Sequence, residues 1–124
     1  MTVTISPEAM EAYRRTARRR EAEQKQAMVQ RRESAWIVAR QAASLLKGQF
    51  GATRVVAYGS LAHGAWFNAR SDIDLMVVGI LPEKFWRAWA ALDQISSGFE
   101  IDLVADEELT ESLRTVIEQE GVEL

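Results

Sequence analysis

The sequence predicts an α/β fold in which three strands are packed against helices. A long segment, residues 7–47, contains no Gly and no Pro beyond its first residue, as is typical of a continuous helix. Further along, three short apolar runs alternate with segments of helical pattern. The chain has 124 residues, 48% of them hydrophobic, enough to bury a core without disulfides or a structural metal.

The predicted N-terminal helix begins at Ser6-Pro7-Glu8, where Ser can cap, Pro suits the first turn and Glu complements the helix dipole. A break near Arg31–Glu33 is a candidate interruption. Its later part is richer in apolar residues, so we expect that part to pack on the domain and the earlier part to project or dock elsewhere. The residues expected on the packed face are Trp36, Ile37, Ala39, Ala43 and Leu46.

Two buried strands are predicted after Gly51, at Arg54–Tyr58 and at Ile73–Val78. Pro82 opens a helix that extends to about Ser96. The buried stripe expected on that helix consists of Phe85, Trp89, Leu92 and Ile95.

A third strand is expected at Phe99–Val104, and a last helix, capped by Asp106 or Thr110, ends at Gly121. We divide the chain into an N-terminal helical extension, residues 1–50, and a domain of residues 51–124.

Composition and charge exclude several classes of function. The chain has no Cys and one His, so disulfide scaffolds, thiol nucleophiles and His-rich zinc catalysis are excluded. Neither a signal-like segment nor ~18 consecutive apolar residues occurs, which predicts a cytoplasmic protein without a membrane span. Residues 1–50 carry a net charge of +5 and residues 51–124 carry −8, so direct binding of the second part to nucleic acid is not expected.

The candidate catalytic groups are three carboxylates in or next to the predicted strands. Strand side chains alternate between faces, so Asp72 and Asp74 lie on one face while Ile73 points into the core. If the second and third strands pair, Asp102 stands beside them. Carboxylates on neighbouring strands repel one another, so they do not all ionise readily. A bound Mg²⁺ or Mn²⁺ ion would offset this repulsion.

A glycine turn follows the first strand. Gly59 lets the backbone approach a phosphate, and the Ser60 hydroxyl can hold its oxygens. Gly64 gives the same freedom four residues later. A phosphate-binding turn followed by an Asp-x-Asp strand describes a nucleoside-triphosphate site.

Tyr58-Gly59-Ser60, followed after eleven residues by Asp72-Ile73-Asp74-Leu75, resembles the signature of the DNA polymerase β nucleotidyltransferase superfamily. The short chain and Asp102 make it similar to the minimal nucleotidyltransferases (MNT) in particular. The resemblance covers Arg54 to the C-terminus. It implies a small mixed β-sheet with flanking helices, to which the long N-terminal helix is an addition.

The resemblance also implies roles for individual residues. Asp72, Asp74 and Asp102 would bind the metal ions, and Asp102 would help to deprotonate the attacking hydroxyl. Gly59 and Ser60 would hold the triphosphate of ATP, the donor of AMP. MNT proteins often carry two arginines where this chain has Leu61 and His63, so His63 or Arg70 is expected to supply part of that charge.

Many MNT proteins are antitoxins encoded beside a HEPN-type ribonuclease toxin, and some adenylylate a tyrosine of that toxin. The expected function is therefore transfer of AMP to such a partner. Two alternatives stay open: a weak or inactive module that neutralises its partner by occlusion, and a nucleotidyltransferase of the antibiotic-modifying type. In either case the N-terminal helix, with little apolar surface of its own, is expected to pack on a second protomer or a partner protein.

Overall fold

The order of elements along the chain confirms the predicted α/β fold. The computed structural model describes residues 4–124; residues 1–3 of the predicted extension lie outside the described residues. The elements are α1 (Pro7–Phe50), β1 (Arg54–Tyr58), α2 (Gly59–His63), β2 (Ile73–Val78), α3 (Pro82–Ala91), η1 (Leu92–Gln94), β3 (Ile101–Ala105), η2 (Asp106–Glu108), α4 (Glu111–Glu120) and β4 (Val122–Glu123). No helix among these described residues is both long enough and apolar enough to span a membrane.

The sheet is mixed and has the strand order β3-β2-β1-β4. Strand β1 runs antiparallel to β2 and β4, whereas β2 and β3 are parallel. We predicted three strands, and β4 is the additional one. Its two residues are too few to show an alternating pattern, and it forms only because the end of the chain returns to β1, where the backbone N–H of Leu124 donates to Val55 O.

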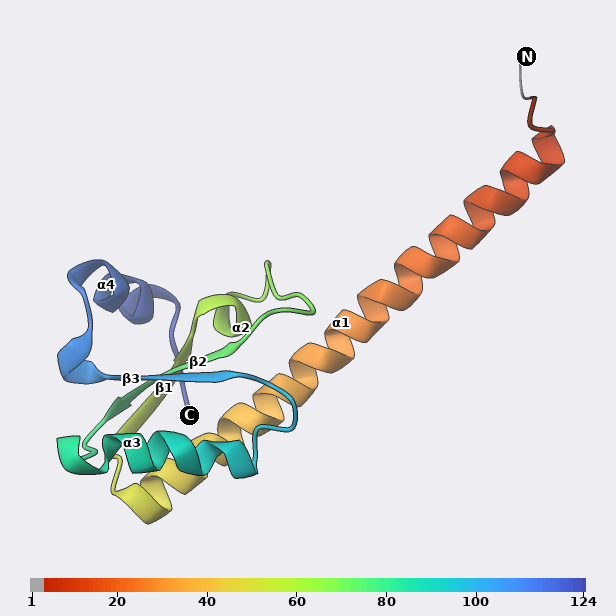
Figure 1. The fold of residues 1–124 in the computed structure, drawn as a ribbon. Coiled ribbons are helices and arrows are strands. Elements are labelled where there is room, and N and C mark those ends of the chain that lie inside the picture. The colour runs from red at the N-terminus through yellow and green to blue at the C-terminus, as the bar shows by residue number, and fades with distance from the viewer. Residues whose placement is uncertain (1–3) are drawn as a thin grey trace.

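Helices cover the two faces of the sheet unequally (Figure 1). Helices α1 and α3 lie against one face, where alternate strand residues such as Val55, Leu75 and Leu103 join the main hydrophobic core. Helix α4 lies on the opposite face over a small second cluster, formed by Val56, Met76 and Ile117. The second face is therefore only partly covered.

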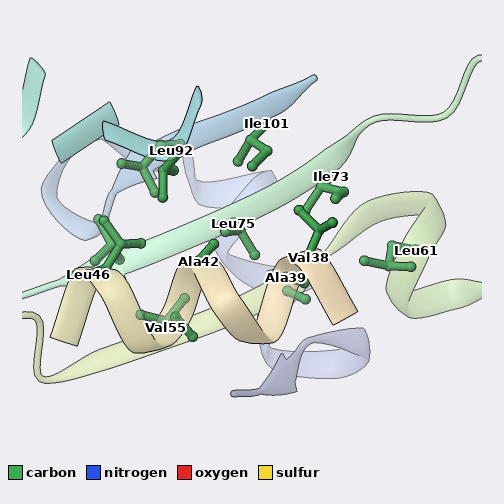
Figure 2. Packing of buried hydrophobic residues seen from close by; sticks show 14 of the residues in the cluster. Val38, Ala39, Ala42, Leu46, Val55, Leu61, Ile73, Leu75, Leu92 and Ile101 are labelled. Carbon is green, nitrogen blue, oxygen red and sulfur yellow. The ribbon is translucent and has the colours of Figure 1, made fainter. Parts of the chain in front are cut away.

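Helix α1 is continuous from the Ser6 cap, whose hydroxyl accepts from Ala9 N–H, to Gly51. The candidate break near Arg31–Glu33 does not occur. The N-terminal half of α1 extends away from the domain (Figure 1), and the C-terminal half of α1 packs across the sheet (Figure 2). The buried residues of α1 are Ala35, Val38, Ala39, Ala42, Ala43 and Leu46.

One residue of the expected α1 face is misplaced. Ile37 is 51% exposed, because the buried positions of α1 are 35, 38, 39, 42, 43 and 46 and residue 37 points about 160° away from residues 35 and 39 around the helix axis. Trp36, also expected there, is partly buried against the core. The alanines at buried positions allow α1 to lie close to the strands, which the larger Ile side chain would prevent.

This register predicts opposite outcomes for two truncations in α1. Leu46 is fully buried, so Leu46→Ala should lower the free energy of unfolding by about 2–5 kcal/mol. Ile37→Ala should change it by less than about 0.5 kcal/mol. Urea unfolding of both variants measures the difference, and similar losses would contradict the observed packing.

The remaining elements agree with the sequence in kind but differ at their ends. The helix after Pro82 is divided into α3 and η1, with Leu92 buried and Phe85, Trp89 and Ile95 packed against the core. Strand β3 begins at Ile101 rather than Phe99. Thr110, not Asp106, caps α4 by accepting from Leu113 N–H, whereas the Asp106 carboxylate accepts from Arg114. The short helix α2 was not predicted.

Candidate active site

A row of three polar side chains crosses the sheet on the α4 face. Tyr58 of β1 is the register partner of Asp74 of β2, and Asp74 is the register partner of Asp102 of β3. Strand neighbours lie ~4.8 Å apart, so the expected proximity of Asp74 and Asp102 follows directly from this pairing. The prediction depended on β2 and β3 being neighbours, and they are.

The row lies at the edge of the area of the sheet that α4 covers. The next row, two residues along each strand, consists of Val56, Met76 and Val104, and it packs under α4. Because side chains alternate, Ile73 and Leu75 on either side of Asp74 are fully buried on the opposite face. The sequence therefore places two acids on a sheet face that is dry at one end and open to solvent at the other.

Asp72 lies just before β2 and is half-buried. Strand alternation extended by one residue would put it on the same face as Asp74, although Asp72 itself lies outside β2. Its charge acts on Asp74, although less strongly than that of Asp102. Asp102 is exposed on β3, the strand at the edge of the sheet.

The central position of Asp74 perturbs its acidity. Burial, followed by the charges of Asp102 and Asp72, raises the pKa of the Asp74 carboxyl to about 6. Burial also raises the pKa of the neighbouring Tyr58 hydroxyl to about 12, with Asp74 and Asp102 adding to the effect. Tyr58 thus stays protonated, and the negative charge of Asp74 is held at a cost that a nearby cation would relieve.

Gly59 makes close contact with this carboxylate. A Cβ at Gly59 would lie 2.5 Å from Asp74 Oδ2, and the backbone φ of +73° is one that side chains rarely adopt. Both requirements point to glycine. The backbone of the turn consequently lies directly against the acid row, so the two halves of the predicted motif meet.

The turn that follows is a single helical turn. Ser60 lies in α2, half-buried, and its carbonyl accepts from the N–H of Gly64 at 2.8 Å. Gly64 ends α2 with a φ of +79° and lies against Arg32 of α1, whose Cζ would be 2.7 Å from a Cβ at that position. Arg32 was not predicted to lie at this turn, since no local pattern links residues 32 positions apart.

Two predicted phosphate-binding residues, His63 and Arg70, lie at the end of α2 and in the connection that follows it. His63 is stacked on Trp66, with ring centroids 4.4 Å apart, and its Nε2 is 3.9 Å from Glu120 Oε1. Arg70 is exposed in the α2–β2 connection, where its backbone N–H donates to Asn68 Oδ1. Among the described residues, no hydrogen bond or ion pair joins either side chain to the acid row.

Among residues 4–124, no three His, Asp or Glu side chains are arranged to hold a metal ion as they stand. The donor chemistry nevertheless suits one: Asp74 and Asp102 offer carboxylate oxygens from adjacent strands, and oxygen ligands are what Mg²⁺ prefers. Burial first, and then the charges of Asp102 and Asp72, raise the pKa of Asp74, so its ionised form is disfavoured here and a cation would relieve that cost.

The sequence of residues 39–124 matches the family model described as a nucleotidyltransferase domain. The match begins inside α1, earlier than Arg54, where the motifs alone begin to resemble that family. This start agrees with the burial of Ala39, Ala42 and Leu46 in the core. No curated protein matches the chain.

Solved structures with the same fold include chains from toxin–antitoxin complexes. One, a toxin–antitoxin with AMP-PNP, has a TM-score of 0.57 at 19% identity, over 68% of this chain and 70% of that one. A second, a tri-AMPylated Shewanella oneidensis HEPN toxin with its MNT antitoxin, has a TM-score of 0.53 at 16% identity, over 72% and 70%. A third, a proposed minimal nucleotidyltransferase, has a TM-score of 0.52 at 28% identity, over 80% and 94%.

Proposed function

This chain belongs to the nucleotidyltransferase domain family, and on that premise we propose that it transfers AMP from ATP to a tyrosine hydroxyl of a HEPN-type toxin encoded nearby, acting as the antitoxin. The observation that carries the proposal is the acid row, in which Asp74 and Asp102 are register partners beside the close-packed Gly59. The resemblance of the fold to MNT chains in complexes with HEPN toxins supports the choice of partner.

In the proposed reaction, the acceptor oxygen forms a bond to the α-phosphorus of ATP while the bond from that phosphorus to the bridging oxygen breaks. Pyrophosphate leaves, and the hydroxyl proton passes to the carboxylate of Asp102. Gly59 and Ser60 hold the triphosphate through backbone N–H groups and the Ser60 hydroxyl. The protein mainly supplies positioning in a transfer of this kind.

Asp72, Asp74 and Asp102 would hold Mg²⁺, or Mn²⁺ in its place. When bound, the ion supplies electrostatic stabilisation of the phosphate charge that develops during transfer. Asp74, central in the sheet and already crowded by Asp102 and Asp72, is the residue whose charge most requires such a counter-ion.

A transfer assay tests this proposal. The purified chain is incubated with Mg²⁺, ATP labelled in the α-phosphate, and the product of the neighbouring gene. We expect label on the partner and its loss when that partner's tyrosines are replaced by Phe. Label that never exceeds a reaction without the chain would contradict the proposal.

The projecting part of α1 favours a second candidate function, in which the chain neutralises its partner by occlusion. Arg14, Arg15 and Arg18 lie exposed on the part of α1 that extends from the domain (Figure 1), and an isolated helix of this composition gains stability by packing on a partner. If occlusion is the mechanism, neutralisation survives Asn at all three acids and is lost when these arginines become Glu. If transfer of AMP is the mechanism, neutralisation is lost with Asn at the three acids and survives Glu at the three arginines.

A further inference from the structure

Two arginines of helix α1 donate to residues near either end of the segment that joins α2 to β2. Arg32 donates to the carbonyl oxygen of Leu61 twice, from Nε at 3.2 Å and from Nη2 at 2.8 Å. Its neighbour Arg31 donates from Nη2 to Ser71 O in a longer hydrogen bond of 3.5 Å. Leu61 lies in the glycine turn and Ser71 directly precedes Asp72. One turn of α1 therefore reaches both parts of the proposed nucleotide site.

Arg32 supplies hydrogen-bond donors to a carbonyl oxygen of α2 that has no partner within the helix. Helix α2 has five residues, so most of its carbonyl oxygens have no partner within the helix. A helix of one turn is also unstable without outside support. Arg32 provides a charged, two-point donor to Leu61 O, one of the carbonyl oxygens without a partner within the helix, and a positive charge beside these oxygens also complements the helix dipole.

Close packing fixes both guanidinium groups in place. That of Arg32 fills the space where a side chain at Gly64 would lie, with Cζ 2.7 Å from the site of such a Cβ. That of Arg31 stacks over Phe99, 4.4 Å from the ring centroid. Both residues are only partly exposed. By contrast, Arg19 on the projecting part of α1 forms an exposed 3.8 Å pair with Glu23, a kind of contact that contributes little.

We propose that Arg32, supported by Arg31, is a positioning residue of the nucleotide site. It acts through Leu61 and Gly64, and it holds the turn that carries Gly59 and Ser60 against the acid row. Its effect on kinetics rests on the proposed function, whereas its effect on the order of the turn does not. The expected substrate consequence is weaker holding of the triphosphate when Arg32 is lost.

Hydrogen exchange of the full-length chain without nucleotide tests the structural part. In Arg32→Ala, amides of residues 60–72 should exchange about tenfold faster, the effect of losing a charged hydrogen bond. Arg32→Lys, which keeps the positive charge but not the planar two-point contact, should fall between Ala and wild type. The matched control Arg40→Ala removes an exposed arginine from the same helix and should leave this segment unchanged. Unchanged exchange in Arg32→Ala overturns the proposal.

Kinetics distinguishes positioning from a purely structural role. Arg32→Ala should raise the KM for ATP about tenfold while kcat changes by less than about threefold, because the acids remain in place. A fall in kcat at unchanged KM would overturn this assignment. If the wild-type chain transfers no nucleotide at all, the proposed function fails, and hydrogen exchange still decides whether Arg32 orders the turn.

A double-mutant cycle tests the contact between Arg32 and Gly64. Gly64→Ala adds both backbone strain, since φ is +79°, and a methyl group against the guanidinium. In the Arg32→Ala background only the strain remains, so the loss of stability should be smaller there. The control Gly51→Ala has a similar φ of +77° with no atom within 4 Å, and should be additive with Arg32→Ala. Additivity at Gly64 would overturn the contact.

Discussion

Asp74→Asn is expected to abolish nucleotidyl transfer while making the metal-free protein more stable at neutral pH. Asp74 is central in the acid row, between Tyr58 and Asp102. Replacement by the isosteric amide removes the charge that would hold Mg²⁺, so the rate should fall by at least about a thousandfold. The same replacement removes a half-buried charge that its neighbours repel.

The gain in stability has a defined pH dependence. The pKa of Asp74 is raised from 3.8 to about 6 in the folded protein, so below pH 3.8 the carboxyl is protonated in both the folded and the unfolded state. As the pH rises through this interval, the unfolded state ionises first and the wild type loses stability, and above pH 6 the loss is complete. Asp74→Asn should therefore be the more stable protein by about 1–2 kcal/mol above pH 6, after allowance for solvent screening of this half-exposed group.

Urea unfolding in EDTA at pH 4 and at pH 7.5, together with the transfer assay, measures both effects. Asp93→Asn is the matched control, because Asp93 is exposed in η1 and outside the acid row. It should retain both activity and stability. A loss of activity in Asp74→Asn that is accompanied by a loss of stability at pH 7.5 would point to misfolding and contradict the prediction.

Gly59→Ala is expected to lower the rate of nucleotidyl transfer by about a hundredfold. Its loss of stability should be no larger than that of the same substitution at a control glycine with a similar backbone conformation. A methyl group at this position would lie 2.5 Å from Asp74 Oδ2. The carboxylate can turn away, because the contact is with the end of a side chain, but it then leaves its place in the acid row. Misplacement of a reacting group by about 1 Å costs this much in rate.

The energetic cost of Gly59→Ala should come mainly from the left-handed backbone, about 1–2 kcal/mol. Gly98→Ala provides the control, since Gly98 has a φ of +86° with no atom within 4 Å of its Cβ position. We expect both variants to unfold at similar urea concentrations while only Gly59→Ala loses transfer activity. Equal activities of the two variants would show that the contact with Asp74 is unimportant.

The predicted elements differ in how well local sequence defines them. Strands β1 and β2 have the bounds that the sequence predicts, since the apolar residues of each are buried. Helix α2 was missed because five residues rich in small side chains show no helical periodicity. Ile37 was assigned to the wrong side of α1 because alanines form much of its buried face, and alanine occurs equally well on either side of a helix.

For this protein, local sequence was sufficient to identify the kinds of elements, the glycine turn and the alternation that puts Asp74 and Asp102 on strand faces, because capping, periodicity and alternation act over a few residues. Tertiary structure alone decided which strands are neighbours, and so that Tyr58, Asp74 and Asp102 form one row. It alone also brought Arg32 to Leu61 and Gly64. These contacts join residues far apart in the chain, and their energies depend on burial that exists only once the sheet and α1 are packed together.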